Sequence, residues 1–156
     1  MSLRPSAPDD DDLLRRVYAS TRVEELAVTG WDDVTKDAFL AQQFEAQRDY
    51  YRANYDGASY DVILVEGQPA GRLYVARWDD EIRLMDIALL PEHRGKGVGT
   101  HLLKRLMEEA DRSGKPLTIH VERQNPALTL YRRLGFEVAA DRGVYVLMRW
   151  EPARPT

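Results

Sequence analysis

Hydrophobic and polar positions along the chain repeat with two periods, one typical of helices and the other of strands. Helical spacing predicts one helix after the acidic run Asp9–Asp12 and a long helix over about 33–54. Two further helices are expected near 99–112 and 126–134. The apolar stripe of the long helix consists of Leu40, Phe44, Tyr51 and Tyr55.

The strand-like stretches are rich in β-branched and aromatic residues, and Gly, Pro or Asp turns separate them. They cover residues 3–5, 60–66, 70–78, 81–90, 117–122, 136–140 and 144–150. The three strands between 60 and 90 follow one another with short turns only, which predicts an antiparallel meander. The mixed order of strands and helices predicts an α/β (α+β) fold with one mixed sheet covered by helices.

Composition narrows the class of protein. The 156 residues are 44% hydrophobic, which favours a single domain spanning 1–156. The chain has no cysteine, so disulfides, cysteine zinc sites and a thiol nucleophile are excluded. With 22 basic and 26 acidic residues, nucleic acid is not expected as a partner. No signal-peptide pattern and no membrane-length apolar run occurs, so we expect a cytoplasmic protein without membrane association.

The most informative stretch is the strand, Gly-rich turn and helix start over 86–100. Alternate glycines let backbone N–H groups point inward, and the following helix N-terminus adds a positive dipole end, so this is a candidate phosphate site. A P-loop is excluded because no Gly-Lys-Ser or Gly-Lys-Thr occurs. The glycine spacing also differs from the dinucleotide fingerprint. Arg94, Gly97 and Gly99 fit the pattern R-x-x-G-x-G instead.

A second block lies about twenty-five residues further on: Asn125-Pro126-Ala127, then Leu130-Tyr131, then Leu134-Gly135-Phe136. With these two blocks in this order, the sequence resembles the GNAT superfamily of acyl-CoA-dependent N-acetyltransferases from about residue 60 to residue 150. The resemblance implies a GNAT fold with splayed central parallel strands. It also divides the chain into a helical acceptor-side region over 1–56, a CoA-binding part over 57–150 and a tail over 151–156.

The resemblance further implies acetyl-CoA as co-substrate, without a metal. Strand backbone would pair with the pantetheine amides, loop N–H groups would hold the pyrophosphate, and an asparagine side chain would contact the cofactor. These residues are Ile87, Ala88, Leu89, Arg94, Gly95, Lys96, Gly97, Val98, Gly99, Thr100 and Asn125. Tyr131 matches a tyrosine that can act as general acid for the leaving thiolate. Alternatively, Tyr131 is only a core residue of an amphipathic helix.

A general base is needed to take a proton from the acceptor amine. Asp86 interrupts an apolar strand, and its alternative is a structural carboxylate hydrogen-bonded to a neighbouring loop or helix. His120 has an intrinsic pKa suited to a base near neutral pH, although a lone strand histidine is more often structural. Glu122 and Glu45 are weaker candidates. A further alternative is that the reaction has no single essential base.

The function predicted is direct transfer of an acetyl group from acetyl-CoA to a primary amine of a small molecule or a protein. The alternative is a non-catalytic acyl-CoA-binding sensor or interaction domain. A phosphate-binding domain unrelated to CoA is disfavoured by the second block. The first helices would supply the acceptor pocket, with Phe39, Gln43, Gln47, Tyr50 and Tyr51 as candidate lining residues. A homodimer through the apolar last strand is a further hypothesis.

Overall fold

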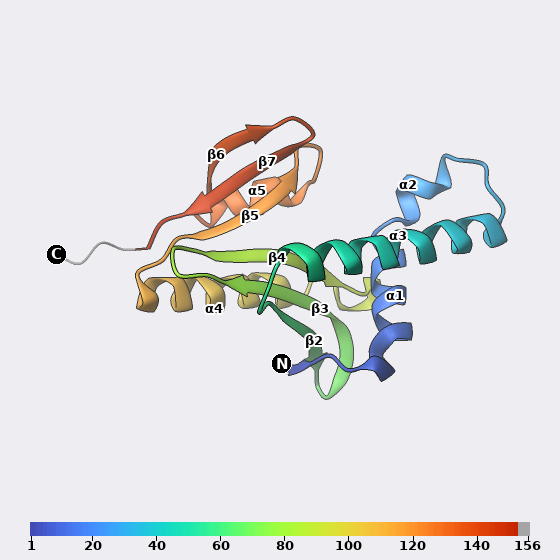
Figure 1. The fold of residues 1–156 in the computed structure, drawn as a ribbon, viewed down its shortest axis with the longest axis horizontal. Coiled ribbons are helices and arrows are strands. Elements are labelled where there is room, and N and C mark those ends of the chain that lie inside the picture. Colours follow the sequence, from blue (N-terminus) through green and yellow to red (C-terminus); the bar gives the residue numbers. More distant parts are fainter. Residues whose placement is uncertain (153–156) are drawn as a thin grey trace. The chain divides into compact units, whose positions relative to one another are not determined.

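The computed structural model describes residues 1–152 of the chain (Figure 1). The strands are β1 (Ser2–Pro5), β2 (Ser59–Val65), β3 (Gln68–Arg77), β4 (Ile82–Leu89), β5 (Leu117–Glu122), β6 (Glu137–Arg142) and β7 (Tyr145–Trp150). The α-helices are α1 (Asp11–Ser20), α2 (Val23–Ala27), α3 (Asp33–Asn54), α4 (Val98–Ser113) and α5 (Ala127–Arg133). Two 3₁₀ turns, η1 (Pro8–Asp10) and η2 (Pro91–His93), precede α1 and α4 respectively.

The strands form one seven-stranded sheet in the order β1-β2-β3-β4-β5-β7-β6. The β1–β2, β5–β7 and β6–β7 pairs are antiparallel, whereas β4 and β5 are parallel. A mixed α/β sheet with helices is therefore confirmed, together with its central parallel pair. The strand β7 lies between β5 and β6, so the apolar last strand is an interior strand and β6 occupies the edge. The homodimer stays a prediction.

The chain divides into two compact units. The first unit contains Met1–Tyr74 and Asp86–Gly99, and the second contains Val75–Met85 and Thr100–Thr156. In the first unit, α1 and α3 both contact the side chain of Arg72 on β3, so they pack on one face of that strand. Leu14, Tyr18 and Phe44 form a buried cluster between these two helices, and Leu40 packs against it.

Charged caps and turn residues set the element boundaries in the first unit. The Asp32 carboxylate accepts a hydrogen bond from the Thr35 N–H at 2.8 Å, which begins α3 one residue later. Glu66 and Gly67 both have positive φ, the conformation that a two-residue hairpin turn needs between β2 and β3. The predicted strands 60–66 and 70–78 leave residues 67–69 for this turn, whereas the structure places it at Glu66-Gly67, and Gln68 already belongs to β3.

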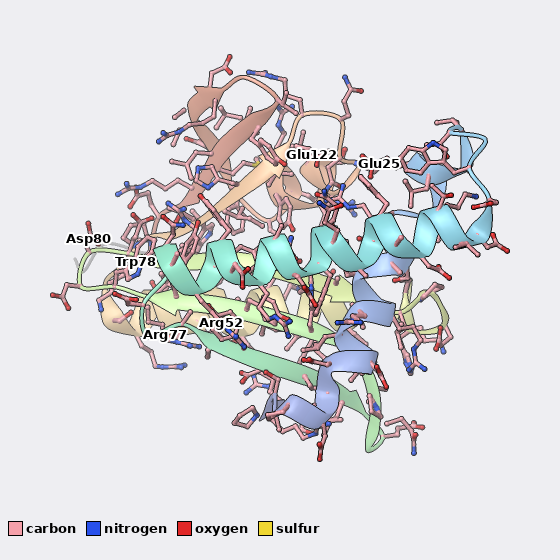
Figure 2. All side chains as sticks on the ribbon, turned by 45° about the vertical axis from the view of Figure 1, so that its right-hand side comes forward. Glu25, Arg52, Arg77, Trp78, Asp80 and Glu122 are labelled. Carbon is pink, nitrogen blue, oxygen red and sulfur yellow. The ribbon has the colours of Figure 1, made fainter. Side chains whose placement is uncertain are left out.

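The second unit contains its own buried cation. The Trp78 N–H donates to the Glu81 carbonyl at 2.9 Å and closes the β3–β4 turn, from whose tip Asp80 points outward (Figure 2). The Arg83 guanidinium is buried, donates to the Thr118 hydroxyl at 2.8 Å and lies 5.3 Å from the Trp78 ring centroid. This network joins the turn to β4 and β5, whose parallel register begins at Ile82 and Leu117.

The four helices predicted from periodicity are present as α1, α3, α4 and α5, and all seven predicted strands are present. The bounds of α3 and β5 agree with the prediction to the residue. The helix α2 was not predicted. It has five residues and one buried side chain, Leu26, so it carries no repeat that a pattern could reveal. The predicted tail over 151–156 lies outside the described residues from 153 onward. That the chain is a single domain stays a prediction.

The Arg4–Asp10 ion pair attaches β1 to η1 and generates a prediction. Two guanidinium nitrogens of Arg4 donate to the Asp10 carboxylate at 2.8 Å, and the Ala7 N–H donates to it at 2.8 Å. These bonds lower the pKa of Asp10 from 3.8 to about 2. The carboxylate thus stabilises the fold above pH 4, and that contribution is lost as the pH falls towards 2.

We expect Asp10→Asn to lower the free energy of unfolding by about 2 kcal/mol at pH 7, measured by urea denaturation. The deficit relative to the unmodified protein should shrink as the pH is lowered from 4 towards 2. Asp9→Asn, at the exposed neighbouring carboxylate, is the matched control and should change stability by less than about 0.5 kcal/mol. Equal losses in both variants would contradict a specific role for the ion pair.

Candidate functional site

The Gly-rich turn has the conformation that its sequence predicts. Gly95 and Gly97 have φ values of 72° and 81°, in the region that favours glycine, and a Cβ at either position would meet no atom within 4 Å. The helix α4 begins at Val98, and the first N–H groups of a helix have no acceptor within it. The exposed turn and these N–H groups form a cradle suited to a phosphate-sized anion.

The side chain of Arg94 is engaged in supporting this turn. Its Nε donates to the Leu89 carbonyl at 2.9 Å, and a terminal nitrogen lies 3.2 Å from the Ser20 hydroxyl. Its backbone N–H donates to the Pro91 carbonyl at 3.2 Å within η2. Arg94 therefore joins the end of β4 to the end of α1. Lys96 is exposed beside the glycines and supplies positive charge to the turn.

The C-terminal half of β4 carries the three residues whose backbone was expected to bind the cofactor. Ile87, Ala88 and Leu89 are partly exposed and belong to the first unit. Gly71 on β3 lies so close to this segment that a Cβ there would stand 2.1 Å from the Ala88 carbonyl oxygen. The absence of a side chain at Gly71 thus fixes the path of β4 at Ala88.

Asp86 is paired with a buried cation. Its carboxylate accepts a hydrogen bond from Arg72, whose side chain is 3% exposed. The same guanidinium donates to the Gln47 side chain at 2.9 Å and packs against the rings of Tyr18 and Tyr74. The partner of Asp86 is thus a residue of the neighbouring strand β3, and not of a loop or helix as the structural alternative supposed. A catalytic role for it stays a prediction.

The second unit carries Tyr131 and Asn125. Tyr131 on α5 is 5% exposed, and its ring makes an edge contact with Phe136 at 5.6 Å between centroids. The Asn125 side-chain oxygen accepts a hydrogen bond from the Ala127 N–H at 2.9 Å, at the start of α5. The side chain of Asn125 is exposed, and its amide nitrogen is the group left to contact a ligand. Thr100, the last residue of the predicted cofactor set, is in the first turn of α4.

His120 is the exposed position of an otherwise mostly buried strand. Its Nδ1 lies 3.2 Å from a guanidinium nitrogen of Arg83. Partial desolvation, together with the charges of Arg83 and Arg142, lowers the pKa of His120 below 6.5. The imidazole is therefore neutral near pH 7, and a neutral imidazole can accept a proton. Glu122 at the end of the same strand is half-buried.

The described part of the first unit contains cavities large enough for a small molecule, and two of them are lined in part by α1 and α3. One of about 560 Å³ is lined by α1, α2, α3 and Leu90 to Glu92. The other, of about 500 Å³, lies between η1, α1, α3, β2 and β3. Of the residues expected to line an acceptor pocket, Gln47 and Tyr51 line this second cavity, whereas Phe39, Gln43 and Tyr50 line neither.

Sequence reasoning did not single out Arg72, although it is the most buried charged residue of the described chain. The sequence did contain a signal for this pair. An arginine in an apolar strand needs a partner, and so does the aspartate of the next strand. The other residues missed are the arginines of α3 that face the second cavity, Arg48 and Arg52. Helical periodicity assigns such residues to solvent unless a packing partner is known.

The sequence model of the Acetyltransferase (GNAT) family matches residues 22–136 of the chain. The chain is 48% identical over 151 residues to the L-amino acid N-acyltransferase MnaT of Escherichia coli, covering 90% of this chain and 82% of that protein. It is 33% identical over 149 residues to the streptothricin acetyltransferase of Streptomyces lavendulae, covering 86% and 79% respectively.

Solved structures resemble this chain in fold. The PaiA N-acetyltransferase of Thermoplasma acidophilum, crystallised with coenzyme A, superposes with a TM-score of 0.72 at 17% identity, over 96% of this chain and 98% of that chain. The acetyltransferase YncA of Salmonella typhimurium, solved with acetyl-CoA, gives a TM-score of 0.59 at 26% identity, over 100% and 96%. The chain belongs to the GNAT family, and it is an N-acyltransferase of that type.

No helix within residues 1–152 is long and apolar enough to span a membrane.

The close approach at Gly71 generates a prediction about β4. We expect Gly71→Ala to push the Ala88 carbonyl away and to lower the free energy of unfolding by about 1–3 kcal/mol, as overpacking does elsewhere. Gly99→Ala is the stability control, because a Cβ there meets no atom within 4 Å. Urea denaturation of both variants tests the difference. A Gly71→Ala protein as stable as Gly99→Ala would contradict the contact.

The environment of His120 generates a second prediction. An NMR titration of the imidazole protons should give a midpoint below 6.5. Replacing a nearby positive charge favours the protonated form, so Arg142→Gln should move that midpoint upward. Arg132→Gln, at an exposed arginine of α5, is the matched control and should leave it unchanged. A midpoint that does not respond to Arg142→Gln would refute the electrostatic cause.

Proposed function

We propose that the protein transfers an acetyl group from acetyl-CoA directly to the primary amine of a small molecule. The observation that carries this proposal is the glycine cradle before α4, with Gly95 and Gly97 at positive φ, which follows η2 and the partly exposed end of β4. A CoA thioester presents a pyrophosphate to such a cradle and amide groups to such a strand. Two neighbours in the comparison were crystallised with coenzyme A or acetyl-CoA.

The residues proposed to hold the cofactor follow from this geometry. The backbone of Ile87–Leu89 would pair with the pantetheine arm, and the N–H groups of 95–100 would face the pyrophosphate. Lys96 would add charge. Arg94 would act through its side chain, by holding the Leu89 carbonyl and hence the end of β4 in place. The free amide nitrogen of Asn125 would supply a further contact.

In the proposed reaction the neutral amine nitrogen attacks the thioester carbonyl carbon, and the carbon–sulfur bond breaks. The sulfur leaves as a thiolate and takes a proton, for which the Tyr131 hydroxyl is the proposed donor. The amine loses a proton to a base. His120 is the better candidate, because its imidazole is exposed and neutral near pH 7, whereas the Asp86 carboxylate is engaged by Arg72. The chain has no cysteine for an acyl-enzyme, which favours direct transfer.

The acceptor class proposed is a small molecule with a primary amine. Relatives named as acting on L-amino acids and on streptothricin support a small acceptor over a protein one. A non-catalytic acyl-CoA sensor is the second candidate. It would need neither a buried Tyr131 hydroxyl nor a neutral exposed imidazole.

Tyr131→Phe removes the proposed acid and keeps the ring that packs on Phe136. We expect kcat for thiol release from acetyl-CoA, with an amine panel as acceptor, to fall on the order of 10²-fold. Affinity for acetyl-CoA, measured by calorimetry, should be unchanged. Tyr145→Phe, at an exposed tyrosine of β7, is the matched control and should retain full activity.

The same assay separates the alternatives. Acetyl-CoA that neither binds nor raises the melting temperature would overturn the proposed function. Binding without thiol release for any amine would favour the sensor. Full activity of Tyr131→Phe would leave the transferase in place and remove Tyr131 from the chemistry.

A further inference from the structure

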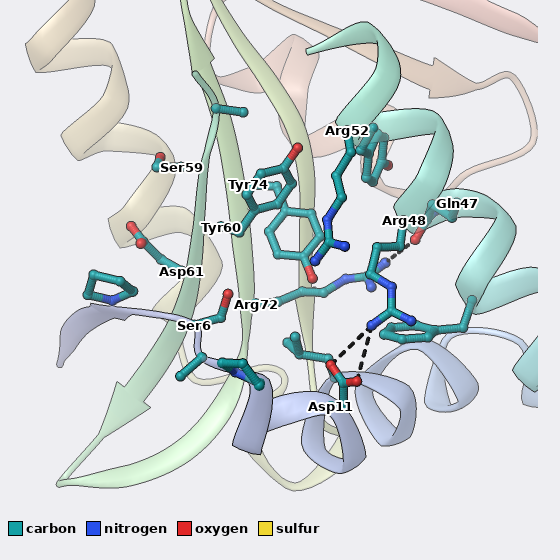
Figure 3. Close-up of a pocket in the computed structure, with 17 residues that line it drawn as sticks. Ser6, Asp11, Gln47, Arg48, Arg52, Ser59, Tyr60, Asp61, Arg72 and Tyr74 are labelled. Atoms are coloured by element: carbon teal, nitrogen blue, oxygen red, sulfur yellow. Dashed lines mark hydrogen bonds and ion pairs between the residues drawn. The ribbon is translucent and has the colours of Figure 1, made fainter. Parts of the chain in front are cut away.

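The cavity between α3 and the strands β2 and β3 is lined by both cations and aromatic rings. Its volume of about 500 Å³ lies within the roughly 300–1,000 Å³ of known small-molecule pockets. In Figure 3 the side chains of Arg48, Arg52 and Arg72 converge on it together with the rings of Tyr60 and Tyr74. Those two rings are in edge contact, with centroids 4.9 Å apart.

Unsatisfied polar atoms gather in this cavity. Within residues 1–152, three buried side-chain nitrogen or oxygen atoms have no hydrogen-bond partner: Arg15 Nε, Tyr60 Oη and Arg72 Nε. The last two belong to residues that line the cavity. Arg72 is 2% exposed, so its Nε–H cannot be satisfied by bulk water. Because an unpaired buried donor costs free energy, the Tyr60 hydroxyl indicates an acceptor group that binds beside it.

Among the arginines that line the cavity, two are in ion pairs with described residues and one is not. Arg48 is paired with Asp11 at 3.1 Å, and Arg72 is paired with Asp86. Arg52 has no carboxylate within ion-pair distance among the described residues. Asp61 also lines the cavity, but its carboxylate points to the other side of β2 (Figure 3). A single negative charge balances this arrangement, whereas a phosphate dianion would exceed it.

The hydroxyl of Tyr60 is suited to donate. Burial raises the pKa of Tyr60, so the phenol keeps its proton at neutral pH. The positive charge of Arg52 lowers this pKa, but by less than burial raises it. The O–H of Tyr60 and the guanidinium of Arg52, whose charge acts on that phenol, offer donors to one carboxylate, and the guanidinium has the matching planar shape. The rings of Tyr51, Tyr74 and Phe44 supply an apolar wall for the rest of the ligand.

We propose that this cavity binds a small molecule through its carboxylate, by Tyr60 Oη and Arg52, and that this molecule is an amino-acid acceptor with an apolar side chain. Arg72, which lines the cavity, contacts Asp86, the residue before the β4 segment proposed to bind the cofactor, whereas none of the lining residues belongs to β4. The identity of the ligand as acceptor rests on the proposed function, whereas the affinity of the cavity for a carboxylate does not.

Two variants test the site without removing the buried Arg72. Tyr60→Phe deletes a hydroxyl that has no partner, so the free energy of unfolding should stay equal or rise. Its Kd for L-methionine and L-phenylalanine, measured by calorimetry, should nevertheless increase about tenfold. Arg52→Gln, at an exposed position of α3, should increase the same Kd about tenfold or more. Arg105→Gln, at an exposed arginine of α4, is the control and should change neither property.

Kinetics with matched acceptors complete the test. With acetyl-CoA, KM for L-methionine should lie at least tenfold below KM for L-methioninamide, and Tyr60→Phe should narrow that gap. Equal KM values for acid and amide, or a Tyr60→Phe protein that binds L-methionine normally, would overturn the site. Inorganic phosphate that binds more tightly than L-methionine would overturn its ligand class. Binding of L-methionine that is not acetylated, while another amine of the panel releases thiol, would retain the carboxylate site and overturn the identity of its ligand as the acceptor. Binding of L-methionine with no thiol release for any amine would retain the carboxylate site and overturn the proposed function alone.

Discussion

The buried guanidinium of Arg72 is the constraint around which the first unit is organised. Removing a cation from water is costly unless partners replace the lost hydration. Here Asp86 on β4 and Gln47 on α3 accept its hydrogen bonds, and the rings of Tyr18 on α1 and Tyr74 on β3 cover it. One side chain therefore relates two strands and two helices. A fold in which any of these elements shifts leaves an unpaired charge in the interior.

This constraint also explains why the cavity beside α3 is polar. A buried cation can satisfy its donors only in the directions where partners stand, and Arg72 Nε–H has none. An apolar side chain in that direction would fill the cavity but would leave the Nε–H without an acceptor. An unfilled polar cavity next to a costly buried charge is the arrangement expected of a binding site, where stability is given up for recognition.

The sequence predicted well those features that depend on neighbours along the chain. The bounds of α3 follow from the Asp32 cap and the apolar stripe, and the turn before α4 follows from its glycines. Pairings between distant segments were not predictable. Arg72 and Asp86 each interrupt an apolar strand, yet only the register of β3 with β4 brings them together. Asn125 shows the converse, because its bond to Ala127 is a local turn interaction that Asn-Pro patterns favour.

The Arg72–Asp86 pair also bears on how a general base can be identified in this protein. Replacing Asp86 with asparagine would remove a candidate base and would also leave the Arg72 guanidinium buried without a counter-charge. The second effect is destabilising by itself, since breaking a buried pair costs more than the pair contributes. Lost activity in such a variant would therefore say nothing about proton transfer. His120 lies at the exposed position of β5, but its Nδ1 is 3.2 Å from the buried guanidinium of Arg83, so a variant there also changes the surroundings of a buried cation. Its part in proton transfer is therefore read from the pH dependence of the reaction and not from lost activity alone.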